Sequence, residues 1–207
     1  TLDWWANAAN ASVFDFALYY TMKDICNNAN GGGHLPNLID PSKSYAAKNA
    51  MKAVTFVGNH DTDEIIRDKM MAYAFILTYK GYPMIWWKDY FDYGLKGLGG
   101  QWGNGIKQLV WVRGKLGGAA PSIELLKTND GDQLIYASYG KSASAPGYIV
   151  VINDNKTAWK GSWVKTGNSY LKNKLLKCYA WYSPVSGQHY QPASKNCDAN
   201  GNVEVWA

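Results

Sequence analysis

Two hydrophobic patterns divide the chain, and they meet near Pro121. Before this point, short apolar runs that start near residues 13, 53 and 82 alternate with segments whose apolar residues recur at helical spacing. The run at 53–57 is apolar on both alternating faces, which is typical of a parallel strand buried on two sides. Alternating strand and helix segments predict βα units, and hence a parallel sheet, in residues 1–120.

Within this part, the first strand is expected in 12–18, followed by a glycine-containing loop at 27–37. A helix is expected after the second strand, with Thr62 or Asp63 capping its start and Gly81 ending it. Its apolar residues at helical spacing are Ile66, Met70, Tyr73 and Leu77. Another helix is expected in 105–118, with one face formed by Ile106, Leu109, Val110 and Arg113.

After Pro121 the apolar runs are short and strand-like. They lie at 133–140, 147–154, 174–183 and 202–207, and Asn-Asp-Gly, Ala-Pro-Gly and Ser-Gly sequences between them signal turns. None of these segments has a convincing helical period. Residues 121–207 are therefore predicted to form an antiparallel β domain with the architecture of a sandwich.

Composition places the chain among soluble globular proteins and narrows its partners. The 207 residues are 47% hydrophobic, and no apolar run approaches the ~18 residues of a transmembrane helix, so no membrane partner is expected. The net charge of +5 is spread without a basic cluster, which does not favour nucleic-acid binding. The first residues show neither an initiator Met nor a signal-peptide pattern, as in a processed or truncated chain. The sequence does not indicate an oligomeric state.

Aromatic residues make up 14% of the chain, with Trp 10, Tyr 15 and Phe 5. Their faces can stack on the C–H face of a sugar ring, although most of them are expected to be large core residues. The three cysteines have no zinc-ligand spacing. Cys178 and Cys197 could close a ~20-residue loop as a disulfide that leaves Cys26 buried and free, or could remain two free thiols.

The most informative segment is AVTFVGNHDTDEI at 53–65, where a buried strand ends abruptly in Asn59, His60 and Asp61. In parallel α/β folds, active sites lie at the carboxyl ends of the strands. An ionisable pair at such an end can serve acid/base chemistry, metal binding or hydrogen bonding to a polyhydroxylated substrate. The alternative is that these residues cap the next helix.

The segment FVGNHDTD resembles the fourth conserved motif of the α-amylases of glycoside hydrolase family 13. Neighbouring segments agree in order: VFDFALYY is similar to the sixth barrel strand, MKAVTFVGNHD to the seventh, and AYAFILTYKGYPMIWWKDY to the next helix and the eighth strand. The likeness is strongest in 12–90 and is greatest to archaeal-type and plant-type enzymes. It implies a fold of the α/β class, with about strands 6–8 of a (β/α)8 barrel in 1–120 and the β-sandwich domain C in 121–207.

The resemblance implies retaining hydrolysis of α-1,4-glucan by an Asp nucleophile, a Glu acid/base and a second Asp. Asp61 matches the second Asp, which binds sugar hydroxyls and helps distort the ring, and His60 matches a residue that hydrogen-bonds the same sugar. Asn59 matches the first member of the motif, with a supporting role. Trp86 or Trp87 could stack on glucose, although burial in the barrel is the favoured interpretation of both.

Some positions depart from the family pattern. Gly58 stands where many members carry Asp, although a small residue at this position also occurs in the family. Trp87 and Lys88 replace the commoner Tyr-Gly, whereas Asp89 keeps an acidic residue. The nucleophile and the acid/base are expected on strands upstream of Thr1, and the final strand of domain C is expected to be missing. Since a complete barrel takes about 250 residues, the 207-residue chain alone is expected to be inactive.

The remaining implications concern metal, location and alternatives. No metal site can be assigned to these residues, and calcium is expected only for the intact family member, through ligands outside this chain. Secretion is implied because starch is too large to enter a cell. One alternative is a non-catalytic starch-binding fragment or inactive homologue, for which the surface tryptophans would form the sugar platform. Another is a family member that is a transglycosylase or a branch-point hydrolase.

Overall fold

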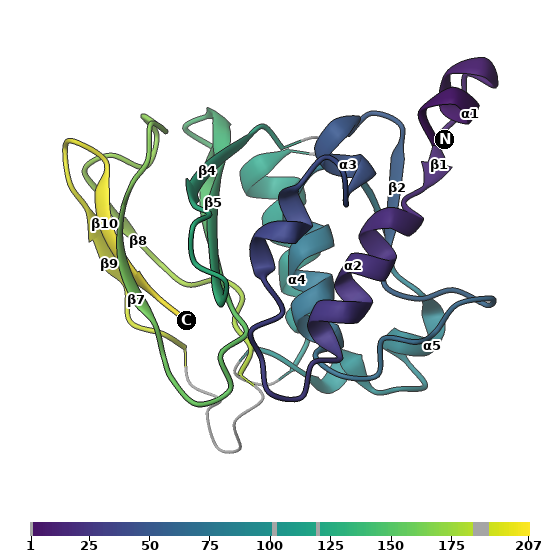
Figure 1. The fold of residues 1–207 in the computed structure, drawn as a ribbon. Coiled ribbons are helices and arrows are strands. Elements are labelled where there is room, and N and C mark those ends of the chain that lie inside the picture. The colour runs from purple at the N-terminus through teal and green to yellow at the C-terminus, as the bar shows by residue number, and fades with distance from the viewer. Residues whose placement is uncertain (1, 101–102, 119–120, 184–190) are drawn as a thin grey trace.

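The computed structural model describes residues 2–100, 103–118, 121–183 and 191–207 (Figure 1). Its first part contains a three-stranded sheet in the order β1-β2-β3, formed by Val13–Phe14, Ala53–Phe56 and Tyr82–Met84. Both strand pairs are parallel. The sheet therefore has the predicted parallel βα arrangement, with strands close to the three predicted starting points.

Helices and short helical turns surround this sheet. The α-helices are α1 (Leu2–Ala8), α2 (Phe16–Cys26), α3 (Tyr45–Lys48), α4 (Lys69–Thr78), α5 (Trp87–Tyr90) and α6 (Gly105–Val112). Single turns occur at η1 (Leu35–Ile39), η2 (Leu95–Gly97) and η3 (Arg113–Gly117). Among the residues that the structure describes, no helix combines the length and the apolar character needed to cross a membrane.

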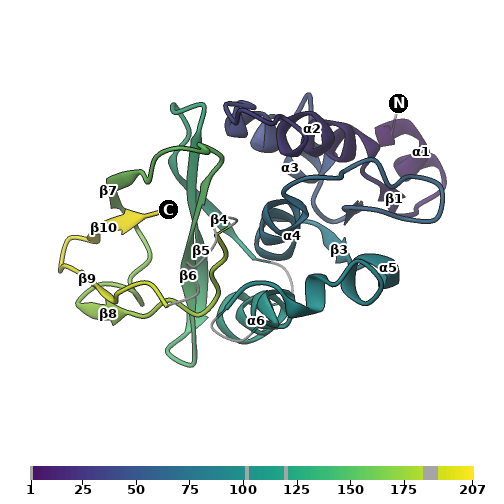
Figure 2. The same cartoon turned by 90° about the horizontal axis from the view of Figure 1, so that it is seen from below.

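The second part is built from antiparallel strands. A three-stranded sheet has the order β4-β5-β6, with bounds Ile123–Lys127, Gln133–Ser142 and Ala145–Asn153. The second part also contains two separate antiparallel strand pairs: β7 (Gly161–Lys165) with β10 (Asn202–Trp206), and β8 (Lys174–Leu176) with β9 (Lys195–Cys197). Figure 2 shows the β4–β6 sheet between these outer strands and the helices α2, α4 and α6.

Strand β5 explains how one sheet serves two cores. Because side chains alternate between the faces of a strand, Leu134 and Tyr136 join the large core cluster that contains the helices. Ile135 points the other way and packs with Val164 and Val203 of the outer strands. The sheet is thus buried on both faces, which accounts for the continuous apolar run in its sequence.

The end of helix α4 joins the two parts through buried polar groups. The Tyr136 and Thr78 hydroxyls lie 2.6 Å apart, and the Tyr148 hydroxyl donates to the Thr78 carbonyl at 2.9 Å. The Arg113 guanidinium, only 7% exposed, donates to the carbonyl oxygens of Leu77, Tyr79 and Gly81. A cation at this position satisfies carbonyls that a helix C-terminus leaves without partners.

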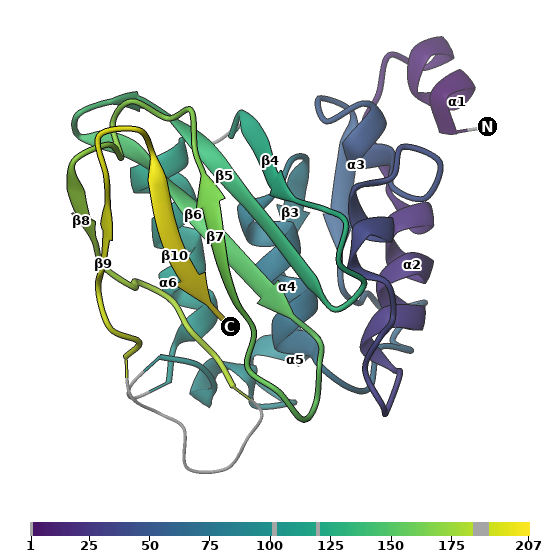
Figure 3. The ribbon, with the colours of Figure 1, turned by 60° about the vertical axis from the view of Figure 1, so that its left-hand side comes forward.

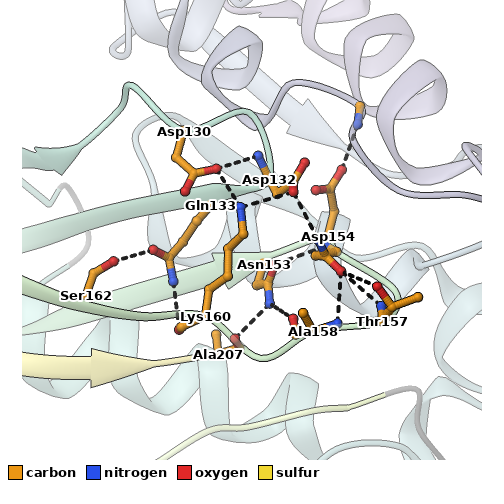
Figure 4. Close-up of polar contacts among 12 residues, drawn as sticks. Asp130, Asp132, Gln133, Asn153, Asp154, Thr157, Ala158, Lys160, Ser162 and Ala207 are labelled. Carbon is orange, nitrogen blue, oxygen red and sulfur yellow. Dashed lines mark hydrogen bonds and ion pairs between the residues drawn. The ribbon is translucent and has the colours of Figure 1, made fainter.

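A polar cluster fixes the loops at one end of the β strands (Figure 4). Lys160 Nζ lies 2.8 Å from Asp130 Oδ1 and 3.0 Å from Asp132 Oδ2. The Lys160 ammonium, followed by that of Lys127, holds the pKa of the Asp130 carboxyl below its usual value. Asp154 accepts a 2.9 Å hydrogen bond from the Gly33 N–H, so the glycine-containing loop after α2 is tied to this cluster.

The structure confirms the mixed α/β class with antiparallel sheets, whereas the barrel and the division at residues 120 and 121 remain predictions. Several local predictions differ from it. The first strand ends at Phe14, because the fully buried Asp15 caps α2 and accepts hydrogen bonds from the N–H groups of Leu18, Tyr45 and Ala46. A carboxylate with three backbone donors favours the helix start over further strand.

The predicted helix after β2 also differs at its start. It begins at Lys69 after Asp68, so Thr62 and Asp63 do not cap it, and Ile66 lies before it with 76% of its surface exposed. Its predicted end is close, since the cap at Tyr79 precedes Gly81, whose φ is +95°. In the helix predicted over 105–118, Ile106 and Arg113 are buried and Leu109 packs on the core as predicted, but Val110 is 46% exposed.

In the second part, the sequence 145–147 lies inside β6 rather than in a turn, next to a register shift between β5 and β6. Strands β4, β7 and β9 have no counterpart among the predicted runs, and only 174–176 of the run at 174–183 is a strand. The Ser-Gly turn signal at 186–187 lies outside the described residues. All three cysteines are free, in agreement with the alternative of unpaired thiols.

The role of Arg113 can be tested by Arg113→Lys. A lysine keeps the charge but cannot present the planar fork of donors that reaches several carbonyls, so at least one buried acceptor loses its partner. We expect the free energy of unfolding to fall by about 1–3 kcal/mol in chemical denaturation. Lys107→Ala, at an exposed position of the preceding helix α6, is the matched control and should change the free energy of unfolding by less than about 0.5 kcal/mol. Equal effects of the two substitutions would contradict this role.

Candidate active site

The Asn-His-Asp segment leaves the carboxyl end of β2, the central strand of the parallel sheet. Phe56 and Val57 are still buried, with 1% and 0% of their surface exposed, and the chain then turns at Gly58. Strands β1 and β3 run parallel to β2 on either side. The segment therefore lies at the edge where the loops after parallel strands gather, as its sequence predicts.

Asn59 organises the turn. Its side-chain oxygen accepts hydrogen bonds from the Asp61 N–H, the Thr62 N–H and the Thr62 hydroxyl, each at 2.9 Å. Its backbone N–H donates to the Thr62 carbonyl at 2.8 Å. An Asn side chain that bonds the backbone two and three residues ahead closes a tight turn. The amide of Asn59 is thus used to shape the loop that presents the next two residues.

His60 and Asp61 form an exposed pair on that turn. His60 Nε2 lies 3.2 Å from Asp61 Oδ2, and the two side chains are 87% and 77% exposed. The pair offers carboxylate acceptors beside an imidazole, which suits hydrogen bonding to sugar hydroxyls and electrostatic stabilisation of a developing cation. The alternative that these residues cap a helix is wrong, because α4 begins eight residues later at Lys69.

A buried ion network lies beside the turn. Lys69 Nζ is 2.6 Å from Asp63 Oδ1 and also contacts Asp89, whose side chain is 0% exposed. The Tyr73 hydroxyl donates to Asp89 Oδ2 at 2.6 Å and accepts from the Trp86 N–H at 3.3 Å. These contacts connect the loop after β2, the first turns of α4 and the loop after β3.

The charges in this network are fixed by their surroundings. Burial acts to lower the pKa of the Lys69 ammonium, but its hydrogen bonds to Asp63 and Asp89 outweigh burial and raise that pKa above its usual value. Burial, followed by the nearby Asp89 charge, raises the pKa of the Tyr73 phenol. Lys69 is therefore charged and Tyr73 neutral at physiological pH, and each donates hydrogen bonds to Asp89.

Trp86 lies between the network and the turn. The Lys69 ammonium is 6.0 Å from the centroid of Trp86 and 4.7 Å from that of Tyr93, within the range of cation–π attraction. A Cβ atom at Gly58 would lie 2.8 Å from Trp86 Cε3 and 3.4 Å from Asp63 Oδ1. Gly58 therefore leaves the space that the indole occupies, and a side chain at this position would meet the ring.

Trp87 does not join this group. It is 65% exposed in this structure, whereas Trp86 is half-buried, and burial of either ring in a closed barrel remains a prediction. The Trp87 ring centroid lies 4.1 Å from that of Phe91. Together with Ile85, Ile106 and Val110, these rings line an open groove of about 310 Å³ between α5 and α6. The structure brings Trp86 close to the turn and places Trp87 in this groove.

Carboxylate and imidazole groups such as these are also common metal ligands. Within 2–100, 103–118, 121–183 and 191–207, no three side chains of His, Cys, Asp or Glu come together in a way that would hold a metal ion. The carboxylates beside the turn are engaged by Lys69, which further disfavours a cation there. The acidic side chains of the described residues thus do not gather into a metal site, and calcium binding by the intact protein remains a prediction.

The sequence did not identify Lys69, Tyr73 or Tyr93 as residues of the site, although Tyr73 was expected on the apolar face of the helix. Lys69 is separated from Asp89 by 20 positions, and its pairing depends on how α4 packs beside β3. One available signal is that Lys69 begins a strongly apolar helix whose following residues are nearly all buried. A lone charged residue at the start of such a helix requires a partner, but the sequence does not show which one.

Parts of the chain are similar to characterised proteins. Over 136 aligned residues, covering 57% of the chain, it is 34% identical to a glucan 1,4-alpha-maltotetraohydrolase of Stutzerimonas stutzeri and 33% identical to the enzyme of that name from Roseateles saccharophilus. Over 97 residues, covering 42% of the chain, it is 38% identical to an alpha-amylase of Bacillus licheniformis. The matches cover 21%, 21% and 18% of those proteins, so the chain spans about a fifth of their length. No protein-family model matches the chain.

The ion network can be tested by Lys69→Met. Removal of the ammonium leaves the buried Asp89 carboxylate without its cation, so we expect a loss of about 3–5 kcal/mol in the free energy of unfolding. Lys48→Met is the matched control, because Lys48 is 54% exposed in its ion pair with Asp3 and such surface pairs contribute at most about 1 kcal/mol. Urea denaturation of both variants measures the difference. A loss at Lys69 no larger than that at Lys48 would argue against a buried, structurally important network.

The contact between Gly58 and Trp86 makes a separate prediction. In Gly58→Ala the new methyl group overlaps the indole, and we expect a loss of about 1–3 kcal/mol with a changed tryptophan fluorescence spectrum. Trp86→Leu in the same chain should recover part of the loss, since it removes the overlapping ring. Gly114→Ala, with no atom within 4 Å of its added Cβ, serves as the control. The absence of any coupling between positions 58 and 86 in a double-mutant cycle would refute the contact.

Proposed function

We propose that this chain is part of an α-amylase-type glycoside hydrolase of family 13 that cleaves α-1,4-glucosidic bonds with retention. The observation that supports it most is the exposed His60–Asp61 pair on a turn at the carboxyl end of the central parallel strand. This segment carries the family's Asn-His-Asp motif, and the similar proteins are an alpha-amylase and glucan 1,4-alpha-maltotetraohydrolases. The α/β part would then supply about strands 6–8 of a (β/α)8 barrel, and residues 121–207 would be domain C.

In this proposal Asp61 acts on the sugar at the cleavage point. Its carboxylate accepts hydrogen bonds from ring hydroxyls, and its negative charge stabilises the oxocarbenium-like transition state. His60 donates a hydrogen bond to the same sugar, and Asn59 holds both residues in place through the turn. The Asp nucleophile and the Glu acid/base would come from preceding barrel strands that the 207 residues do not include, so this chain alone would not hydrolyse glucan.

Trp86 is the better placed of the two tryptophans for a substrate contact near this turn, because its ring lies against Gly58. Trp87 would contact a longer substrate only if the glucan followed the groove between α5 and α6. We further propose that the protein is secreted and that other parts of the intact enzyme bind calcium. The likeness to archaeal-type and plant-type enzymes also belongs to the proposal.

The second candidate is a starch-binding protein without catalysis. It is favoured by the exposed tryptophans of the β part, among them Trp163 at 73% and Trp206 at 50%. This candidate predicts binding to starch without release of reducing sugar. A transglycosylase or branch-point hydrolase would share the motif, and a product profile on starch, pullulan and cyclodextrin separates these from an α-amylase.

Asp61→Asn in the intact protein tests the proposed function. The substitution removes the charge but keeps the shape, so we expect kcat on soluble starch to fall at least about 10²-fold, with the midpoint of thermal unfolding unchanged because the side chain is exposed. Asp24→Asn, at an exposed position on α2, is the control and should leave kcat unchanged. Near-normal turnover by Asp61→Asn would exclude the assigned role.

A further inference from the structure

The outer face of the β part carries two exposed indoles on paired strands. Trp163 lies on β7 and Trp206 on β10, and they are 73% and 50% exposed. In the antiparallel register, Trp163 is opposite Glu204 and Trp206 is opposite Gly161. All four side-chain positions therefore share one face, since alternate residues of a strand point the same way. Figure 3 shows β7 and β10 side by side in the layer nearest the viewer.

The ring of Trp206 lies over Gly161 and is hydrogen-bonded to Glu204. Three of its ring atoms lie 2.5–2.8 Å from the position that a Cβ atom would take at Gly161, so the indole covers the backbone where a side chain is absent. Glu204 is hydrogen-bonded by Lys195 at 3.1 Å and by the Trp206 side chain, contacts that lower the pKa of its carboxyl. One face of the ring thus rests on the strand while the other remains open to solvent.

Trp163 extends this surface. Diagonal neighbours on an antiparallel pair have Cα atoms about 7–8 Å apart, within the span of adjacent large side chains. The positions between and beside the indoles carry Glu204, Lys195 and Lys165, which supply acceptors and donors. The surface is therefore two aromatic faces separated by polar groups, rather than a continuous apolar patch that would suit a protein core.

We propose that Trp163 and Trp206, with Glu204 and Gly161 positioning Trp206, form a binding surface for an α-1,4-glucan chain, separate from the Asn-His-Asp turn. Aromatic faces take the C–H faces of sugar rings, and the flanking charged groups take hydroxyls. An immobilised ring loses little conformational freedom on binding, which favours affinity from a small contact. A polymer of identical sugars can occupy both rings at once and gain from the pair.

The position of this surface gives it a distinct role. Figure 2 shows β7 and β10 on one side of the β4–β6 sheet and α4, β3 and α5 on the other, so the surface faces away from the candidate active site. This surface would hold the enzyme on insoluble glucan while another segment of the glucan is cleaved. This inference rests on the proposed function for its ligand, but it requires no catalysis.

The test is depletion of the intact protein by insoluble starch granules, with Asp61→Asn in every variant so that the granules are not consumed. Trp163→Ala, Trp206→Ala and Gly161→Ala should each raise the dissociation constant about tenfold or more, the last because its methyl group displaces the ring. Trp163→Phe should stay within about threefold, because a ring is retained. Trp159→Ala, 54% exposed in the preceding loop, is the matched control and should bind like the parent.

A second readout separates this inference from the proposed function. With Asp61 restored, the same variants should hydrolyse soluble maltoheptaose with kcat/KM within about twofold of the parent. If the parent protein itself does not hydrolyse maltoheptaose, that result counts against the proposed function alone. Trp163→Ala should fold normally, because the position is exposed. If this variant binds granules as tightly as the parent, the proposed glucan-binding surface is overturned. An equal loss in Trp159→Ala, or a shift from dimer to monomer in the tryptophan variants by analytical ultracentrifugation, would also overturn it.

Discussion

Helix α4 is held between two buried cations, and most of the described structure depends on where this helix lies. At its start, Lys69 bridges Asp63 and Asp89. At its end, Arg113 takes the carbonyl oxygens of Leu77 and Tyr79. Removing either charge from water is unfavourable unless its partners are in place, so the ion contacts select one position of the helix among those that its apolar surface would allow.

Because α4 contacts both sheets, its position fixes the structure at both of its ends. Its first turns share the Asp63 network with the loop that carries the Asn-His-Asp segment, and its last turn binds the β4–β6 sheet through Thr78, Tyr136 and Tyr148. The β part is therefore packed against the same helix that supports the candidate active site. A sheet buried on both faces is well suited to this, since it contributes to two cores with a single set of strands.

The sequence predicted features that depend on local pattern. The three parallel strands and the position of the Asn-His-Asp turn follow from apolar runs that end in polar residues, and the end of α4 follows from Gly81. Features that depend on distant partners were not predictable. Asp15 ends the first strand because it finds N–H donors on another helix, and Trp87 lines the open groove between α5 and α6. The Lys69 network requires three segments to meet in space.

The contact between Gly58 and Trp86 has a consequence for how this sequence can change over generations. A larger residue at 58 fits beside the indole at 86 only if the ring shifts, because the added Cβ would lie 2.8 Å from Trp86 Cε3. The effects of substitutions at the two positions are therefore coupled, and the cost of a side chain at 58 depends on the residue at 86. The order of change matters for the same reason, since a side chain gained at 58 costs less after the ring at 86 has become smaller than before.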